Sequence, residues 1–255
     1  MKIKALGASG GVAPGYQTTC YQIDDHLLVD CGAASSEMSV EAQASLTDIL
    51  ITHPHLDHIK DIAFIIENSF SASRPVLNLR SKSSVLDDVH RHLFNDVLWP
   101  DFSKIINNPK TKSNILNFQS FENQLELDGY KITMIDVNHP GNAVGFIIDD
   151  GVHQIVFSGD TGPTDELWEI ANSQENLKAV FTEISFPNDM LPLAEASGHM
   201  TTKLLVQEIK TKLDSDVPLF INHFKPLYFS QLVKEFHELA PSNWTLLHQN
   251  HELNF

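Results

Sequence analysis

The chain has 255 residues, of which 42% are hydrophobic and 20% are charged. This length and composition allow a sizeable buried core and exclude an intrinsically disordered protein. The formal net charge of -16 disfavours a long polyanion such as RNA or DNA as a partner, and the most basic stretch, Lys110 to Lys112, is small.

Short apolar segments rich in β-branched residues are typical of strands, and they recur along the chain. Strands are expected at residues 3–5, 19–23, 26–30, 48–51, 76–79, 131–136, 143–149, 154–158, 179–183, 217–221 and 244–248. Apolar residues at helical spacing predict helices at residues 83–98, at 165–171 with Thr164 as N-cap, after Thr201, and at 229–239. Gly7, Gly10 and Gly11 follow the first strand, but extended sequence comes next, which favours a turn over a dinucleotide-binding loop.

The order of these elements indicates a layered α/β fold, with two sheets and helices outside them. No repeat or flexible linker divides the sequence, so we expect one domain over residues 1–255. The first residues lack the apolar core of a secretory signal, and no later stretch is apolar over the length of a membrane span. Cys20 and Cys31 are too few for a disulfide framework, which predicts structural thiols and a cytoplasmic location.

A histidine-rich segment directly after the apolar residues 48–51 is the sharpest feature of the sequence. It reads Thr-His-Pro-His-Leu-Asp-His and contains His53, His55, Asp57 and His58. Imidazoles bind borderline metals such as zinc, and a carboxylate adds charge. Because alternate side chains on one short loop diverge, a single ion cannot take all four. We therefore expect two ions, one held by His53 and His55 and the other by Asp57 and His58.

Each ion needs further ligands, and three polar residues elsewhere in the chain are placed to supply them. His139, Asp160 and His223 each come just after an apolar segment predicted to be a strand. Side chains at strand ends project from the edge of a sheet into a common site. The sequence therefore predicts a metal centre built from segments that are far apart in the chain.

The His-x-His-x-Asp-His loop, with a later His, Asp and His at strand ends, resembles the metallo-β-lactamase superfamily nearly end to end. The resemblance implies an αββα sandwich with a dinuclear site at one rim of its sheets. It implies the following ligands: His53, His55 and His139 for the first ion, Asp57, His58 and His223 for the second, and Asp160 bridging both. True β-lactamases often have cysteine at the bridging position, so Asp160 is similar to the phosphodiesterase branch.

Within that superfamily the sequence looks like the class II cyclic nucleotide phosphodiesterases, in which leucine precedes the aspartate of the loop. The segments that carry this likeness are residues 53–59, 94–95 with 99–102, 159–163, 185–188, 197–201 and 223–226. The sequence departs from the family signature at Asp61, where a small residue is expected, and at Ala63-Phe64. These departures bear on the substrate pocket and leave the metal chemistry untouched.

The resemblance implies hydrolysis of 3′,5′-cyclic nucleotides, cyclic AMP and also cyclic GMP, to nucleoside 5′-monophosphates. Two divalent ions, zinc by preference and otherwise manganese or iron, activate a water in such sites. An alternative is a nuclease of the ribonuclease Z kind, which shares Ala196-x-x-His199-x-Thr201. That family usually has glycine at the position of Leu56 and carries a basic arm that is missing here. A third hypothesis, a non-catalytic metal or nucleotide sensor, does not require a complete set of metal ligands.

Several further residues receive predicted roles. We expect Asp57 and His199 to be catalytic, with His199 as proton donor to the leaving oxygen. Asn188, His199 and Trp99 are predicted to contact substrate, a small anionic phosphodiester. Two further hypotheses are a lid, formed by His90, His92, Trp99 and Phe102, and a homodimer, suggested by the family likeness. Asp30, at the end of a predicted strand, is placed to hold a ligand imidazole.

Overall fold

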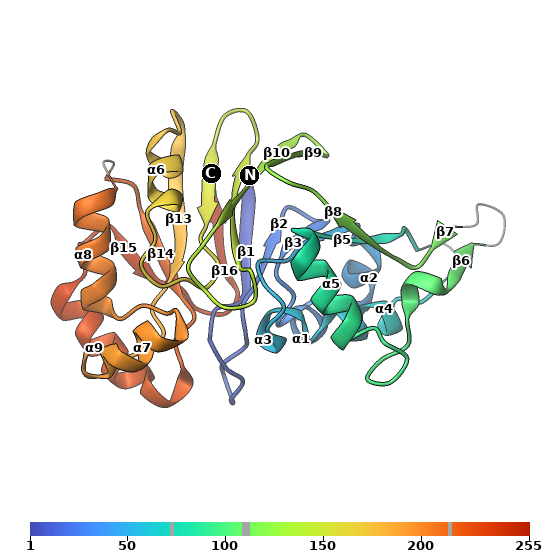
Figure 1. Cartoon of the computed structure of the whole chain (residues 1–255), viewed down its shortest axis with the longest axis horizontal. Helices are drawn as coiled ribbons and strands as arrows, with labels where there is room; N and C mark the ends of the chain where they lie inside the picture. Colours follow the sequence, from blue (N-terminus) through green and yellow to red (C-terminus); the bar gives the residue numbers. More distant parts are fainter. Residues whose placement is uncertain (72–73, 109–112, 214–215) are drawn as a thin grey trace.

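The computed structural model describes residues 1–71, 74–108, 113–213 and 216–255, and the basic stretch Lys110 to Lys112 lies outside them. The described chain forms two seven-stranded mixed sheets that pack face to face, with helices on both outer faces (Figure 1). The predicted αββα sandwich is confirmed.

The first sheet has the spatial order β16-β1-β2-β3-β4-β5-β8. Strands β16, β1, β2 and β3 are antiparallel neighbours, whereas β3, β4, β5 and β8 run parallel. Its strands are β1 (Lys2–Gly7), β2 (Cys20–Ile23), β3 (Leu27–Val29), β4 (Asp48–Leu50), β5 (Leu77–Ser81), β8 (Leu116–Ser120) and β16 (His251–Asn254).

The second sheet has the order β15-β14-β13-β12-β11-β10-β9. It is antiparallel from β9 to β12 and parallel from β12 to β15. Its strands are β9 (Gln124–Leu127), β10 (Tyr130–Asp136), β11 (Val144–Asp149), β12 (Gln154–Phe157), β13 (Leu177–Glu183), β14 (Leu219–Asn222) and β15 (Trp244–Leu246). A separate hairpin pairs β6 (Ile106–Asn108) with β7 (Ser113–Asn114).

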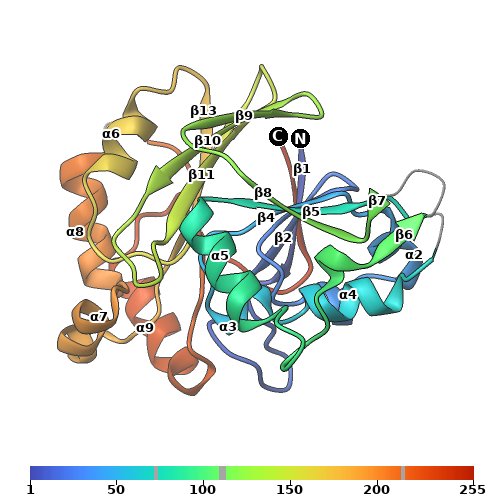
Figure 2. The same ribbon diagram turned by 45° about the vertical axis from the view of Figure 1, so that its right-hand side comes forward.

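The helices divide between the two outer faces (Figure 2). On the side of the first sheet lie α1 (Ala34–Glu37), α2 (Val40–Ser45), α3 (Leu56–Ile59), α4 (Ile62–Asn68) and α5 (Ser83–His92). On the side of the second sheet lie α6 (Glu166–Asn172), α7 (Leu191–Ser197), α8 (Thr202–Lys212) and α9 (Phe229–Leu239). Short 3-10 turns are η1 (Phe102–Lys104), η2 (Asn188–Met190) and η3 (Pro226–Tyr228).

Three clusters of buried apolar residues hold the four layers together. The central cluster lies between the sheets and includes Phe157 and Phe181, whose rings stack at 4.7 Å. One outer cluster joins the first sheet to α4 and α5 through Ile65 and Val85. The other joins the second sheet to α6, α8 and α9 and includes the fully buried Trp168. The central strands of both sheets are therefore buried on two faces, which explains why β3, β4 and β14 are nearly continuous apolar runs.

Two predicted helix boundaries were wrong. The helix expected to reach residue 98 ends at His92, because the Asn95 side chain accepts hydrogen bonds from the backbone N–H groups of Val97 and Leu98 and so competes with the helix. Helix α6 begins with Asp165 at the N-cap instead of Thr164, whose own N–H donates to Glu208.

Cys20 and Cys31 are both unpaired and buried, and burial raises the pKa of each thiol. The prediction that they serve the core is consistent with this placement. None of the described helices has the length and apolar character needed to cross a membrane.

Candidate metal centre

The histidine-rich segment leaves β4 and turns into the short helix α3. His55 is the N-cap residue of α3, and Asp57 and His58 lie within this four-residue helix. His53 lies before the turn and is fully buried, whereas His55 is exposed. The change from extended backbone to helix sends the side chains in different directions, a feature that the sequence alone did not reveal.

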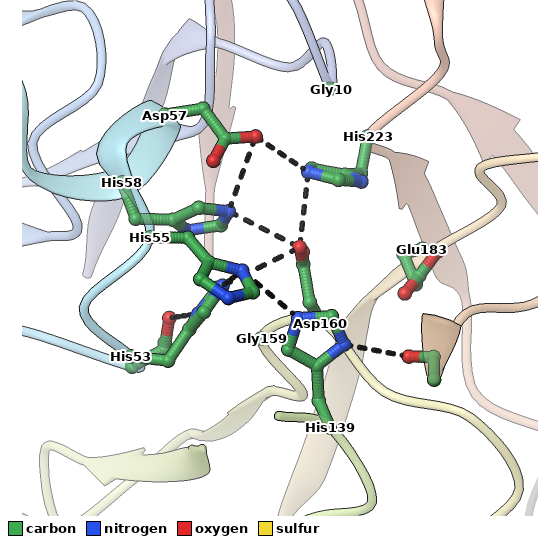
Figure 3. Close-up of polar contacts among 12 residues, drawn as sticks. Gly10, His53, His55, Asp57, His58, His139, Gly159, Asp160, Glu183 and His223 are labelled. Atoms are coloured by element: carbon green, nitrogen blue, oxygen red, sulfur yellow. Dashed lines mark hydrogen bonds and ion pairs between the residues drawn. The ribbon is translucent and has the colours of Figure 1, made fainter. Parts of the chain in front are cut away.

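The second sheet brings three more polar residues to the same place (Figure 3). His139 lies in the turn after β10, Asp160 follows β12, and His223 follows β14 in the left-handed region with φ of 63°. Gly159, just before Asp160, also has a positive φ of 62°, and a Cβ atom there would lie 3.0 Å from the Cβ of Thr52. Glycine thus lets the two sheets approach closely beside the cluster.

The side-chain nitrogens and oxygens of these residues form two groups. In one, His55 Nδ1 lies 3.0 Å from His53 Nε2 and 3.2 Å from His139 Nε2. In the other, Asp57 Oδ2 lies 3.3 Å from His223 Nε2 and 4.0 Å from His58 Nε2. The structure therefore brings together all seven residues predicted as ligands.

Asp160 faces both groups at once. Its Oδ2 atom lies 3.7 Å from His53 Nε2, 3.3 Å from His58 Nε2 and 3.1 Å from His223 Nε2 (Figure 3). One carboxylate oxygen thus reaches a histidine of the first group and two of the second.

The donor set fits a divalent cation of the zinc, manganese or iron kind. His58 Nε2 is buried and, within the described residues, has no well-aligned hydrogen bond; it faces the Asp160 carboxylate at 3.3 Å, as two ligands of one metal would. Burial holds the pKa of His53 well below its ordinary value, which keeps the ring neutral with a free lone pair. Burial alone would raise the pKa of Asp160, but His223 and His58 hold it well below its ordinary value, so the carboxylate is charged.

Asp30 holds the histidine loop in place through hydrogen bonds to two of its residues. It follows β3 with a positive φ of 57° and is almost completely buried. Its Oδ2 accepts from His58 Nδ1 at 2.7 Å, and its Oδ1 accepts from the backbone N–H of Thr52 at 2.9 Å. The predicted contact between Asp30 and an imidazole of the loop is confirmed. This hydrogen bond holds Nδ1, so Nε2 is the ring nitrogen that would bind a metal. Burial alone would lower the pKa of His58, but the carboxylates of Asp160 and Asp30 raise it well above its ordinary value, so a metal at Nε2 would have to displace a proton.

Sequence reasoning missed a second supporting carboxylate, Glu183, which is fully buried at the end of β13. Glu183 Oε1 accepts from His199 Nδ1 at 2.6 Å. Ser185 Oγ donates to Glu183 and lies 2.8 Å from His223 Nδ1. The available signal was the position of Glu183: like Asp160 and His223, it is a polar residue at the end of an apolar strand.

His199 lies beside the cluster and not on the surface. Its ring centroid is 4.7 Å from that of His139 and 5.3 Å from that of His223. With Nδ1 held by Glu183, Nε2 is the nitrogen left for other partners. Burial alone would lower the pKa of His199, but the neighbouring Glu183 carboxylate raises it above its ordinary value.

The other predicted contacts lie outside the histidine cluster. Trp99 is half-buried and packs edge-to-face on Phe64, and Phe102 is buried in the outer core of the first sheet. His90 Nε2 bonds to Asp101 at 2.9 Å. Asn188 accepts from the backbone N–H of Lys203, in the first turn of α8. The substrate roles of Trp99 and Asn188 stay predictions. Of the four residues proposed as a lid, only His92 lines the apolar groove between α3 and α5 that Pro54 and Leu56 also border.

The departure from the family signature at Asp61 has a structural explanation. Asp61 is buried, and its Oδ2 accepts from the backbone N–H and the hydroxyl of Ser35 at 2.8 and 2.7 Å. Its Oδ1 pairs with Lys60 Nζ at 2.7 Å. Asp61 therefore ties α4 to α1 and takes no part in the cluster.

A family model described as the beta-lactamase superfamily domain matches residues 26–212. The chain belongs to the metallo-β-lactamase superfamily, in agreement with its fold and its cluster of histidines and aspartates. This fold family implies divalent metal ions, and the residues present fit them.

Among individual proteins, the chain is similar to a probable 3′,5′-cyclic-nucleotide phosphodiesterase of Yersinia pestis. The two are 23% identical over 277 residues, which cover 89% of this chain and 79% of the relative. The crystal structure of unliganded yeast PDE1 superposes with a TM-score of 0.82 at 18% identity, covering 100% of this chain and 99% of that one. The short form of human tRNase Z gives a TM-score of 0.70 at 14% identity, covering 100% and 99%. These two structural likenesses concern the fold alone.

Proposed function

We propose that this protein is a dinuclear metal-dependent phosphodiesterase that hydrolyses 3′,5′-cyclic nucleotides to nucleoside 5′-monophosphates. Membership of a hydrolase superfamily and relatives named cyclic-nucleotide phosphodiesterases support the reaction class. The substrates to test are cyclic AMP, which the family likeness suggests, and cyclic GMP.

The observation that carries the proposal is the position of Asp160 between the two groups. Its Oδ2 lies 3.1 to 3.7 Å from three histidine nitrogens that belong to both groups. In our assignment His53, His55 and His139 hold one ion, Asp57, His58 and His223 hold the other, and Asp160 touches both. When bound, two divalent ions, zinc by preference, supply a water of lowered pKa and polarise the phosphoryl oxygens.

The charges of the site explain how an acidic protein takes an anionic substrate. Five of the seven assigned ligands are histidines, and only Asp57 and Asp160 are carboxylates. The two carboxylates cancel only part of the charge that two divalent cations bring, so the site attracts a phosphodiester by its local field. Asp57 is the half-exposed one of the two, and we assign it the further task of orienting the attacking oxygen.

His199 serves as the proton donor. As the new P–O bond forms, the bond from phosphorus to the sugar O3′ breaks, and O3′ takes a proton from His199 Nε2. Glu183 holds the opposite nitrogen of the ring, so Nε2 is the nitrogen left to donate. The contact with the His139 ring keeps His199 beside the reacting phosphate.

A nuclease of the ribonuclease Z kind is the second candidate, because human tRNase Z shares the fold. The net charge of -16 weighs against a tRNA substrate, since a polyanion loses affinity on a surface of like charge. A sensor without catalysis is less well supported, because the cluster holds a complete set of metal-ligating groups around one carboxylate. We further propose that residues 1–255 form one domain and that the protein is cytoplasmic. The oligomeric state that we propose to test is a homodimer.

The test is incubation of the purified protein, with its metal content measured, with cyclic AMP and separately with cyclic GMP, followed by chromatography of the products. Formation of the 5′-monophosphate, abolished by a chelator and restored by zinc or manganese, is the expected result. Absence of any 5′-monophosphate from a protein with two ions bound per chain would refute the cyclic nucleotide assignment. Cleavage of a tRNA precursor by the same sample would favour the nuclease.

A further inference from the structure

An apolar groove of about 380 Å³ runs beside the histidine loop. Pro54 and Leu56, which flank His55 in the sequence, form part of its wall, together with Ile59 of α3. The opposite wall comes from α5 and the turn after it, through Asp88, His92, Leu93 and Leu98. In both views α5 lies next to α3 (Figures 1 and 2).

The groove has the size and lining of a small-molecule site. Its volume is in the range of small-molecule sites, and its walls are mainly aliphatic with a few polar groups. Leu56 and Leu98 are 63% and 61% exposed, so an occupant would remove apolar surface from water on both walls. Because the groove shares its wall with the loop that carries His55, a phosphate at the cluster would leave the attached nucleoside beside it.

Asp88 is the one acidic group in this wall. It is half-buried, and in the described part of the chain its carboxylate makes no hydrogen bond or ion pair. His92 stands four residues further along α5, on the same face of the helix. A carboxylate accepts hydrogen bonds and donates none. Guanine offers two adjacent N–H donors, at N1 and N2, that a carboxylate accepts together, and O6 beside them accepts from an imidazole N–H. Adenine offers one amino group next to an acceptor nitrogen, which a carboxylate repels.

We propose that this groove is the base-recognition subsite of the enzyme and that Asp88 makes it select guanine over adenine. The inference rests on the proposed function, in that it takes a nucleotide as the substrate. It goes further by naming the part of the substrate that the groove holds and the residue that reads it.

The test measures binding of the two product nucleotides, so that it does not depend on turnover. Titration calorimetry of the metal-loaded protein with 5′-GMP and 5′-AMP should give about tenfold tighter binding of 5′-GMP, the discrimination of one good bidentate pair. Asp88→Asn should remove the preference, because an amide nitrogen then faces the guanine donors. Asp87→Asn is the matched control: it removes the same charge from the neighbouring residue of α5, which borders a different depression, and should leave the preference intact.

Equal affinities for the two nucleotides in the unaltered protein, or a preference that survives Asp88→Asn, would overturn the proposal. Retention of the 5′-GMP preference in a protein that hydrolyses no cyclic nucleotide would refute the proposed function and leave the subsite standing. The two failures are therefore distinguishable.

A second copy of the chain is the competing occupant of the groove. Leu98→Ser distinguishes a nucleotide base from a second copy as the occupant, because Leu98 forms an exposed part of the wall. For a base subsite, the substitution should weaken binding of both nucleotides about fivefold without changing the oligomeric state. Loss of a dimer in light scattering, with unchanged nucleotide affinity, would show that the groove is a contact between copies and would overturn the proposal.

Discussion

Replacing Asp30 by asparagine should weaken metal binding although Asp30 is not an assigned ligand. In the native chain its Oδ2 accepts the Nδ1 proton of His58 at 2.7 Å and lies 2.8 Å from the hydroxyl of Thr52. An asparagine that keeps its oxygen on the Thr52 backbone N–H must turn its amino group toward His58. Two N–H donors then face each other. The conflict is relieved if the His58 proton moves to Nε2, but this removes the lone pair that faces Asp160.

The expected loss follows from the role of this hydrogen bond. Removing the group that orients a ligand imidazole lowers metal affinity by about 10–100-fold, which corresponds to roughly 1.4–2.7 kcal/mol. The buried and unmatched amide should also lower the free energy of unfolding of the metal-free protein by about 1–3 kcal/mol.

The assay is competition for zinc against a chromophoric chelator, with urea unfolding of the metal-free protein measured alongside. Asp48→Asn is the matched control. Asp48 is equally buried, in the adjacent strand β4 of the same sheet, and pairs with Arg80 instead of a histidine. It should lower stability by a similar amount and leave zinc affinity unchanged. If the two variants bind zinc equally well, the argument that Asp30 sets the His58 tautomer is wrong.

Other substitutions test the remaining parts of the site. Asp160→Ala should leave the fold intact by circular dichroism, reduce bound metal below two ions per chain and abolish nearly all turnover; full activity would refute the dinuclear assignment. His199→Ala should lower kcat by about 10²–10⁴-fold with metal content unchanged by mass spectrometry, and a loss of metal instead would show that His199 is a ligand. Gly10→Ala places a Cβ atom 2.7 Å from the backbone oxygen of His223 and 2.9 Å from its ring. This substitution should lower the free energy of unfolding by about 1–3 kcal/mol, with a lower melting temperature, and should weaken zinc binding because the ring of His223 is displaced.

Most strands of the two sheets could be predicted from the sequence, because a strand buried on both faces is a short apolar run whatever its neighbours are. Strands β8 and β9 were not predicted, and neither was the C-terminal strand β16. Its residues, His251–Asn254, are mostly polar, and only pairing with β1 makes them a strand. The turn after α5 was missed for a related reason: apolar spacing continued to residue 98, while a single side chain, Asn95, ended the helix.

The gathering of the seven assigned ligands at one rim could be inferred before the fold was known. His53, His55, Asp57 and His58 are close in sequence, and His139, Asp160 and His223 each follow an apolar strand. Strand ends of a layered fold meet at a common edge, so a polar residue directly after an apolar strand can be recognised in the sequence as a candidate site residue.

Only the tertiary structure could show how these ligands are supported and what lies beside them. Glu183, Ser185 and His199 meet because β13 and the turn before α8 lie side by side, and no local pattern encodes that contact. The groove between α3 and α5 arises in the same way, from helices whose packing depends on the whole first sheet. Sequence by itself indicated which residues can bind a metal, because ligand type is a property of single residues and short spacings. Orientation, protonation partners and the shape of the groove between α3 and α5 depend on contacts between distant segments, and those contacts exist only after the two sheets have packed together.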